Sequence, residues 1–364
     1  MSLLVFLALQ SSLALAQEGQ SEGAPLNLGT PQDMVDQANL SYVRGDCELA
    51  QYLYQKALEV EPNNSNALLG KGRALVCQGA IEAGIAEYKK IAAVDPNNLS
   101  AYIQLAIAQL SLYLDNPAIQ GNALNEAYQA VQQAERINAA DAKVANIKGV
   151  VLYQQGNLEA AKVALESAVN LAQNQALSNS DLAQMHINLG RTYRSLEDLS
   201  LALSSFRRAV ILNPSSGEAH SLLGETYFMQ GKCEEGLFEL TQGANLNPAS
   251  LMVVANLAIA TFECGDEVAS EGWFKQALEI DGVSLPPLYS YLSRIYVKQG
   301  RYDDAIREAQ KGALLPPNNA EALYWLGYAY QVKGDLQAAK EAFGRALELD
   351  QEFTPAVDAL RSIP

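Results

Sequence analysis

The sequence predicts an all-α fold in which antiparallel helix pairs stack side by side into an array. Three observations carry this prediction. Two segments, 218–248 and 320–350, are near-duplicates of each other. Prolines recur at a spacing of 34 residues, from Pro62 to Pro96 and from Pro214 to Pro248. Hydrophobic residues make up 49% of the chain and charged residues 18%, a composition that speaks against disorder.

The unit at 218–248 shows why the pattern indicates two helices. Apolar or small residues fall on one face of each, namely Leu223, Gly224 and Tyr227 on the first and Gly236, Leu240 and Gly243 on the second. Gly231 can adopt the positive φ that closes the first helix, and Pro248 cannot continue the second. A single pair leaves half of its apolar surface uncovered, so neighbouring pairs must stack.

The shared frame has Leu before Gly or Ala in the first helix, an aromatic residue three positions later, Gly at the turn, and small and aromatic residues in the second helix. It resembles the tetratricopeptide repeat. The resemblance implies a right-handed α-solenoid, a superhelix of about nine repeats over 31–353, followed by a short capping helix at 354–364. The copies lie at about 31–64, 65–98, 142–175, 183–216, 218–248, 251–284, 286–319 and 320–353, and the third copy lies between the second and the fourth.

Two of these units depart from the frame. In the third, 21 residues separate Ala106 from Ala127 where the frame expects 12, so Asp115-Asn116-Pro117 and the following residues read as a stretched turn. After the fourth, the segments 173–175 and 178–180 are rich in Asn, Gln and Ser and read as a polar spacer. We expect the curvature of the array to be interrupted there.

The N-terminus carries an apolar run over residues 2–16 that ends in Ala14-Leu15-Ala16, before Gln17. This resembles the core and Ala-x-Ala cleavage site of a secretory signal peptide, and the run is shorter than the roughly 20 residues that span a bilayer. No Lys or Arg precedes Arg44, so either the start codon is misplaced or the leader is atypical. Residues 17–30 are expected to be a flexible lead-in, with no stable membrane anchor after cleavage.

Four cysteines occupy equivalent places in the repeats. Cys47 and Cys233 follow a turn glycine, and Cys77 and Cys264 precede the turn glycine of the next unit. Because the turns of stacked pairs lie side by side, we predict disulfides Cys47–Cys77 and Cys233–Cys264. Persistent disulfides imply an oxidising compartment, in agreement with the leader. The alternative is four free thiols in a cytosolic solenoid.

Charge and motifs exclude several function classes. The formal net charge of −16 argues against nucleic acid and anionic membranes as partners; it fits a solvated acidic surface or, alternatively, a basic protein partner. His186 and His220 are the only histidines and lie 34 residues apart, without a third ligand of suitable type, so we expect a structural role rather than a metal site. No catalytic or phosphate-binding motif is present, and we expect neither a cofactor nor an enzyme.

Function is therefore expected on the concave face. In the tetratricopeptide repeat family, positions 2, 5, 6, 9 and 12 of each first helix line a groove that binds an extended peptide or a partner helix. Carried over to this sequence, the groove is lined by Asn39, Arg73, Asn146, Asn188, Arg191, Asn256, Tyr291, Arg294, Tyr324, Trp325 and Tyr328. Asn can hold a peptide backbone, Arg can bind a carboxylate, and aromatic residues give rigid apolar contact. The Lys-Asn-Asn-Lys-Arg clamp of chaperone-tail-binding members is not reproduced in any three consecutive repeats, which speaks against binding to a cytosolic chaperone tail.

The sequence thus predicts an exported protein-interaction scaffold in a periplasm or comparable lumen, where it would support assembly of an envelope complex. This expectation rests on the family resemblance. A cytosolic co-chaperone or regulatory adaptor is the alternative, and a metal-binding or enzymatic protein centred on His186 and His220 is the least favoured. The partner's identity and the oligomeric state are left open.

Overall fold

The computed structural model describes residues 29–117, 121–316 and 319–363. These residues form nineteen helices and contain no strand. The predicted all-α class is therefore confirmed. The predicted signal peptide, its cleavage site at Ala14, Ala16 and Gln17, and residues 17–28 of the predicted lead-in lie outside the described residues.

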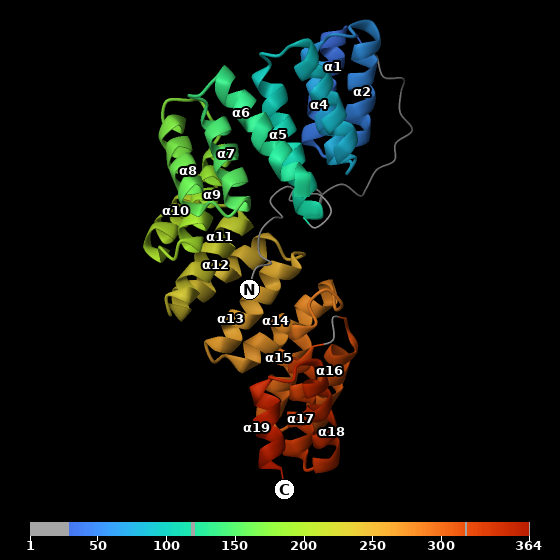
Figure 1. The fold of residues 1–364 in the computed structure, drawn as a ribbon, viewed down its shortest axis with the longest axis vertical. Helices are drawn as coiled ribbons and strands as arrows, with labels where there is room; N and C mark the ends of the chain where they lie inside the picture. The colour runs from blue at the N-terminus through green and yellow to red at the C-terminus, as the bar shows by residue number, and fades with distance from the viewer. Residues whose placement is uncertain (1–28, 118–120, 317–318, 364) are drawn as a thin grey trace. The chain divides into compact units, whose positions relative to one another are not determined.

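Eighteen of the helices form nine antiparallel pairs, and the two helices of a pair lie side by side (Figure 1). The first helices are α1 (Pro31–Val43), α3 (Ser65–Cys77), α5 (Leu99–Asp115), α7 (Ala142–Gln154), α9 (Asn179–Ser195), α11 (Gly217–Met229), α13 (Leu251–Glu263), α15 (Pro287–Lys298) and α17 (Ala320–Lys333). The second helices are α2 (Cys47–Val60), α4 (Ile81–Val94), α6 (Gly121–Ile137), α8 (Leu158–Ala172), α10 (Leu199–Leu212), α12 (Cys233–Leu246), α14 (Glu267–Ile280), α16 (Tyr302–Leu314) and α18 (Leu336–Leu349).

The packing divides the chain into two units, Met1–Leu212 and Asn213–Pro364. Within each unit, a second helix packs against the first helix of the following pair, for example α2 against α3 and α12 against α13. First helices also contact the first helices of neighbouring pairs, such as α1 with α3 and α15 with α17. We call the surface formed by the first helices of each unit its inner face.

Small residues let the two helices of a pair approach closely. A Cβ atom placed on Gly224 would lie 2.8 Å from the carbonyl oxygen of Gly236 and 2.8 Å from the amide nitrogen of Leu240. In other pairs the small residue faces an aromatic ring, as Gly190 faces Phe206 and Gly327 faces Phe343. Both rings are fully buried, so ring and glycine together fill the contact between helices.

Turn and cap residues set where the helices begin and end. The Thr30 hydroxyl and the Asp33 carboxylate form a capping box at the start of α1. Gly231 adopts φ 74° at the turn between α11 and α12, as its sequence position predicts. The equivalent turn between α9 and α10 instead places Glu197 at φ 64°, an uncommon conformation for a residue with a side chain.

The third and fourth pairs, which depart from the frame in sequence, differ from the prediction in different ways. The insertion in the third pair lengthens both of its helices: α5 and α6 have 17 residues each, whereas α3 and α4 have 13 and 14. The predicted spacer after the fourth pair is wrong at its end, because Asn179 and Ser180 are helical. The Ser178 hydroxyl accepts a hydrogen bond from the Asp181 amide at 3.0 Å and so starts α9 early.

Neighbouring pairs are tied together at their turns. The four cysteines pair as their turn positions predict, Cys47 with Cys77 and Cys233 with Cys264, with Cα–Cα distances of 6.1 and 5.9 Å. Both distances fall in the usual disulfide range. Between α14 and α15, Lys298 and Glu267 form an ion pair at 2.6 Å in the corresponding place.

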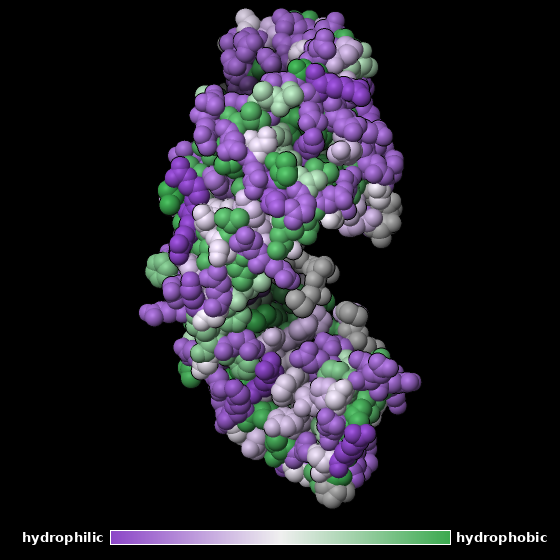
Figure 2. Space-filling view, turned by 60° about the vertical axis from the view of Figure 1, so that its left-hand side comes forward, coloured by the Kyte–Doolittle hydropathy of each residue, from purple (hydrophilic) through white to green (hydrophobic). Residues whose placement is uncertain are grey.

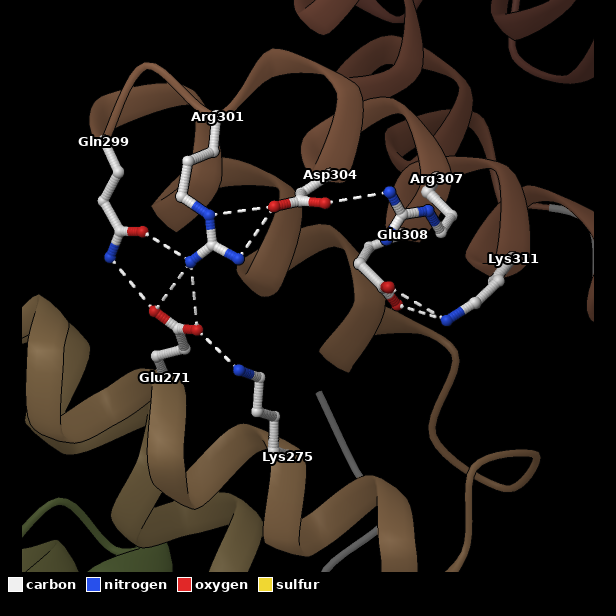
Figure 3. Close-up of polar contacts among 8 residues, drawn as sticks. All are labelled: Glu271, Lys275, Gln299, Arg301, Asp304, Arg307, Glu308 and Lys311. Atoms are coloured by element: carbon white, nitrogen blue, oxygen red, sulfur yellow. Dashed lines mark hydrogen bonds and ion pairs between the residues drawn. The ribbon is translucent and has the colours of Figure 1, made fainter.

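A charged network reinforces that last junction (Figure 3). The Glu271 carboxylate on α14 accepts hydrogen bonds from Lys275 at 2.6 Å, Gln299 at 3.1 Å and Arg301 at 3.2 Å. Arg301 also contacts Asp304 on α16 at 2.9 Å. Burial alone would raise the pKa of Glu271, but these hydrogen bonds outweigh it and lower the pKa to about 2.

The last helix, α19 (Thr354–Ser362), packs against α18 and α17. It buries Ala356, and the following Ile363 is also buried. These residues join the apolar cluster that includes Phe343 and Ala346 of α18. The helix therefore covers apolar surface that the ninth pair would otherwise expose.

Among the described residues, no helix combines the length and the apolar character that a membrane span requires.

Candidate functional site

The predicted groove residues lie on first helices and form three groups and one separate residue. Asn39 and Arg73 belong to a polar groove on α1, α3 and α5. Asn146, Asn188 and Arg191 lie on α7 and α9, and Asn256 lies on α13. The aromatic patch on α13, α15 and α17 contains five of the predicted residues, Tyr291, Arg294, Tyr324, Trp325 and Tyr328.

The polar groove encloses about 470 Å³. Its lining is rich in amide side chains and is formed by Gln32, Val35, Asp36, Asn39, Asn66, Leu69, Arg73, Ser100 and Gln104. Amide groups donate and accept hydrogen bonds together, which is the requirement of an extended peptide backbone. Ser100, Gln104, Gln32 and Asn66 were missed by the sequence prediction, although they occupy positions 2 and 6 of their units.

Among the described residues that line this groove, Arg73 is the only arginine or lysine. Its guanidinium lies over the ring of Tyr42 at 5.5 Å, and its Nε atom is buried without a hydrogen-bond partner. Asn39 is partly used within the fold, because its Oδ1 atom accepts a hydrogen bond from the Tyr54 hydroxyl at 2.6 Å. Burial raises the pKa of Tyr54, and the neighbouring Arg73 partly opposes this shift.

The amide residues on α7 and α9 contact each other. The Nδ2 atom of Asn188 donates to Oδ1 of Asn146 at 3.0 Å, and Gln184 donates to Oδ1 of Asn188 at 3.3 Å. A cavity of about 20 Å³ beside Asn188 is lined by Arg191 and Tyr153 among others. This volume holds at most one water molecule, so this group is less open to a ligand than the polar groove.

Asn256 has a partner that the sequence prediction missed. Its Nδ2 atom donates to Oε1 of Glu225 on α11 at 2.6 Å. Glu225 occupies position 9 of its unit, the position that supplied Arg73 and Arg191, so the same rule could have found it. This hydrogen bond joins α11 and α13. It occupies the amide donor of Asn256 that we expected to hold the backbone of a bound peptide.

The centre of the aromatic patch is Arg294. Its guanidinium lies 4.7 Å from the ring centroid of Phe262, 5.1 Å from that of Tyr291 and 5.1 Å from that of Trp325. Tyr291 in turn stacks on the buried Phe274 at 5.1 Å. Burial raises the pKa of Tyr291, and Arg294 partly opposes this shift.

The rest of the patch is on α17. Trp325 meets Tyr324 at 5.2 Å and Tyr328 at 5.6 Å, both edge to face. Tyr324 also contacts Phe353, which precedes α19, at 5.8 Å. Sequence reasoning missed Phe353 because it ends the ninth unit and is not a groove position of a first helix. It also missed Phe262, although position 12 of the frame supplies it. These contacts fix the rings, so little side-chain entropy remains to be lost on binding.

The two histidines lie in different units. Both ring nitrogens of His220 face oxygen atoms, Nδ1 towards Glu239 at 2.6 Å and Nε2 towards the Pro214 carbonyl at 3.1 Å. Burial, followed by the charge of Arg208, lowers the pKa of His186. The described residues contain no group of three or more His, Cys, Asp or Glu that could hold a metal ion.

Polar and apolar residues are mixed on the drawn face of the molecule (Figure 2). On the face seen in Figure 2, hydrophilic residues predominate and hydrophobic residues lie in small groups between them. The inner-face groups combine amide donors and acceptors, two stacked guanidinium groups and fixed aromatic rings. Such an arrangement can bind a polypeptide through its backbone and a few side chains, and the described residues of these groups include no paired nucleophile and base for catalysis.

Sequence models described as tetratricopeptide repeat match residues 44–112, 138–210, 187–245 and 292–361. Among curated proteins, the anaphase-promoting complex subunit CDC16 of Saccharomyces cerevisiae is 25% identical over 57% of this chain and 24% of its own length. The human protein O-mannosyl-transferase TMTC1 is 28% identical over 47% of this chain and 20% of its own length. This chain therefore spans about a quarter or less of either relative.

Among solved structures, the APC/C hetero-tetramer Cut9–Hcn1 is similar with a TM-score of 0.56. The match is 16% identical and covers 92% of this chain and 67% of that chain. At this identity the likeness concerns the fold, an array of stacked helix pairs.

Proposed function

The chain belongs to the tetratricopeptide repeat family, and from this premise we propose that it is a non-enzymatic scaffold or adaptor that binds another protein on its inner face. The observation that carries the proposal is the polar groove on α1, α3 and α5, which presents amide groups and the partly buried Arg73 in one open concavity. The partner would lie there as an extended peptide or as a helix, with its backbone held by amides.

The aromatic patch of the second unit supports the same role. Rigid Trp and Tyr side chains and Arg dominate the binding energy of many protein interfaces, and here Trp325, Tyr328 and Arg294 are fixed by mutual contacts. The O-mannosyl-transferase activity in the name of one relative belongs to a protein of which this chain matches 20%, and we propose no transfer activity here.

We further propose that the protein works after export, in a periplasm or comparable oxidising lumen, and supports assembly of an envelope complex. The paired cysteines and the apolar leader at residues 1–16 support export, because disulfides persist in oxidising compartments. A partner protein, and neither nucleic acid nor an anionic membrane, is proposed because the net charge is −16.

Photo-crosslinking in the protein's own cell tests the scaffold function. A photoreactive amino acid is placed at Gln32 or Ser100 in the polar groove, or at Tyr328 in the aromatic patch, and cross-linked proteins are identified by mass spectrometry. We expect the same partner to be captured from the groove positions. The matched controls carry the photoreactive residue on second helices, at the exposed Tyr52 and Phe238.

Capture of one partner from the inner face and not from the controls supports the function. Equal capture from Tyr52 and Phe238, or none from the inner face, contradicts it. The same experiment with fractionated cells tests the location. Full-length protein that retains residues 1–16 and four alkylatable thiols in the cytosol would replace export with the cytosolic adaptor alternative.

A further inference from the structure

Four aromatic rings form a row at the C-terminal end of the second unit. The ring of Tyr328 meets Trp325 at 5.6 Å and Trp325 meets Tyr324 at 5.2 Å, both edge to face. Tyr324 in turn contacts Phe353, in the connection between α18 and α19, at 5.8 Å. All four side chains are partly exposed, so one ligand can contact them in succession. We call these four residues the aromatic row.

The row leads into a concavity of about 490 Å³ at the start of α17. Most of the residues that line it are apolar, and the full lining is Pro286, Pro287, Asn319, Ala320, Glu321, Leu349, Asp350 and Phe353. Leu349 is 46% exposed, an unusual fraction for a large apolar side chain. Phe353 belongs both to the row and to the concavity, so the two form one continuous surface with room for several residues of a peptide.

The polar groups of the row can donate hydrogen bonds. The hydroxyls of Tyr324 and Tyr328 form no hydrogen bond with another described residue. The indole N–H of Trp325 donates to Glu321 at 3.4 Å, a long contact that a closer acceptor can replace. The amide side chains of the polar groove, in contrast, offer donors and acceptors together. The row therefore matches a ligand backbone that has free carbonyl groups and few N–H groups.

A polyproline II helix is the backbone that meets this requirement. Its carbonyl groups have no internal partners, and each proline lacks an N–H group. A bound α-helix would keep its carbonyl groups in internal hydrogen bonds, and an extended peptide without proline would need acceptors for its N–H groups. Proline rings also pack against aromatic rings. Because the rings of the row are fixed by mutual contacts and a polyproline II helix is preformed, little entropy is lost on either side.

We propose that the aromatic row and the adjoining concavity bind a proline-rich segment of the partner protein in the polyproline II conformation. Its proline rings pack against the rings of the row and the apolar wall of the concavity. Its carbonyl groups accept hydrogen bonds from the hydroxyls of Tyr324 and Tyr328 and from the indole N–H of Trp325. The proposal rests on the scaffold function and names the partner's chemistry at the second unit.

Charge adds a second requirement. The carboxylates of Glu321 and Asp350 line the concavity, and neither forms an ion pair with another described residue. Asp350 accepts a hydrogen bond from the Glu352 amide at 3.1 Å, and a carboxylate has lone pairs for more than one such contact. A Lys or Arg beside the prolines would pack its apolar stem on Leu349 and direct its charge to these carboxylates. The segment that fits is therefore proline-rich with a basic residue next to the prolines.

The probe for this proposal is a synthetic oligoproline peptide with one Lys at its end, titrated into the full chain with its disulfides intact. Calorimetry measures the affinity, and indole fluorescence reports on the row. The control peptide has alanine in place of every proline, which restores the N–H groups and favours an α-helix. We expect the control to bind about tenfold or more weakly. This comparison leaves the protein unchanged, so it does not depend on a variant folding.

Variants of the chain assign the contact. Trp325→Ala removes a ring and should weaken the oligoproline peptide about tenfold or more. Tyr328→Phe keeps the ring and removes only the hydroxyl, so we expect a loss of about threefold to tenfold. The matched controls are Phe238→Ala and Tyr52→Phe, at exposed aromatic residues of second helices, which should leave binding unchanged. Circular dichroism melts confirm that each variant is folded.

The charge requirement is tested with a third peptide in which Gln replaces the Lys. It should bind more weakly than the Lys peptide to the unaltered protein. Glu321→Gln should reduce that difference, as a double-mutant cycle requires. Glu341→Gln, at an exposed residue of α18, is the control and should leave the difference unchanged.

A preference for oligoproline that is lost with Trp325→Ala and Tyr328→Phe, and kept with both controls, supports the proposal. Equal or tighter binding of the alanine peptide overturns it and assigns the surface to an apolar helix. Absence of oligoproline binding, or binding that both row variants leave unchanged, also overturns it. Those results leave the scaffold function standing, because its own failure shows as a lack of inner-face cross-links in cells.

Discussion

Glu197 shows that a turn between two helices can keep its left-handed conformation without glycine. Seven equivalent turns place glycine at positive φ, namely Gly45, Gly79, Gly156, Gly231, Gly265, Gly300 and Gly334, while the turn after α9 uses Glu197 at φ 64°. The repeat frame could predict the glycines, because each closes a first helix. It could not predict that the fifth turn keeps the same conformation without glycine, at a cost of about 1 kcal/mol for the side chain.

Glu197→Gly should therefore stabilise the protein. Relief of the left-handed strain outweighs the extra backbone freedom that glycine has in the unfolded chain, and we expect a gain of about 0.5–1 kcal/mol. Urea unfolding followed by circular dichroism measures it. Glu197→Ala is the control, since alanine retains the strain; an equal gain from alanine would attribute the effect to the lost charge and refute the conformational reason.

Gly224 is required for a different reason, because two helices pack too closely at this position to leave room for a side chain. The sequence predicted a close contact between helices here, and backbone atoms of Gly236 and Leu240 lie 2.8 Å from the point that a Cβ atom on Gly224 would occupy. Gly224→Ala should destabilise by about 2–3 kcal/mol, because backbone cannot move as a flexible side chain does.

The matched control for this change is Gly344→Ala in α18, where a Cβ meets no atom within 4 Å. There the better helix propensity of alanine should stabilise by about 0.5–1 kcal/mol. Thermal melts of both variants compare the two sites. A Gly224→Ala melt equal to that of the unaltered protein would show that this helix contact is looser than the structure has it.

At the scale of elements, neighbouring helix pairs are joined either by disulfides or by charged side-chain contacts. Disulfides join the first pair to the second and the sixth to the seventh, and the seventh is joined to the eighth by Lys298–Glu267 and the Glu271 network. Cysteine positions predicted the former. The charged contacts could not be predicted, because a charged residue at a turn position can be exposed to solvent as well as paired.

Glu271→Gln should lower stability in a pH-dependent manner. The folded pKa of about 2 lies below the ordinary value of 4.5, so the carboxylate stabilises the fold fully above pH 4.5 and loses that effect as the pH falls towards 2. Allowing for partial solvation, we expect a loss of about 1–2 kcal/mol at neutral pH.

The difference between Glu271→Gln and the unaltered protein should close between pH 4.5 and pH 2. Urea unfolding at several pH values measures this difference directly. Asp358→Gln, at an exposed acidic residue of α19, is the control and should show little difference at any pH. A Glu271→Gln deficit that persists unchanged at pH 2 would assign the loss to packing and not to charge.

Replacing both Cys233 and Cys264 by Ser should cost about 3–4 kcal/mol, as expected for opening a loop of 31 residues in the unfolded chain. Unfolding with and without a reducing agent provides the measurement. The double variant should be insensitive to reductant at this junction, while the Cys47–Cys77 pair still responds. A variant as stable as the oxidised protein would mean that the sixth and seventh pairs do not depend on the covalent link.

At the scale of the whole molecule, repetition explains both what the sequence could predict and what it could not. Periodic residues such as Gly224 and Phe343 recur because every pair repeats the same contact, so fold class and helix order follow from them. The division after Leu212 and the aromatic patch have no such period. Phe353 ends the ninth unit at a position that the frame does not define, and only the folded chain brings it against Tyr324.

The central claim is that the inner face is the working surface of the protein, and hydroxyl-radical footprinting of the complex with the captured partner tests it most directly. The account predicts that Tyr324, Trp325 and Tyr328 lose reactivity when the partner binds. Tyr52 and Phe238, exposed by 47% and 62% on second helices, should stay reactive. Protection of Tyr52 and Phe238 with unchanged reactivity on α17 would contradict the claim and place the partner on the outer helices.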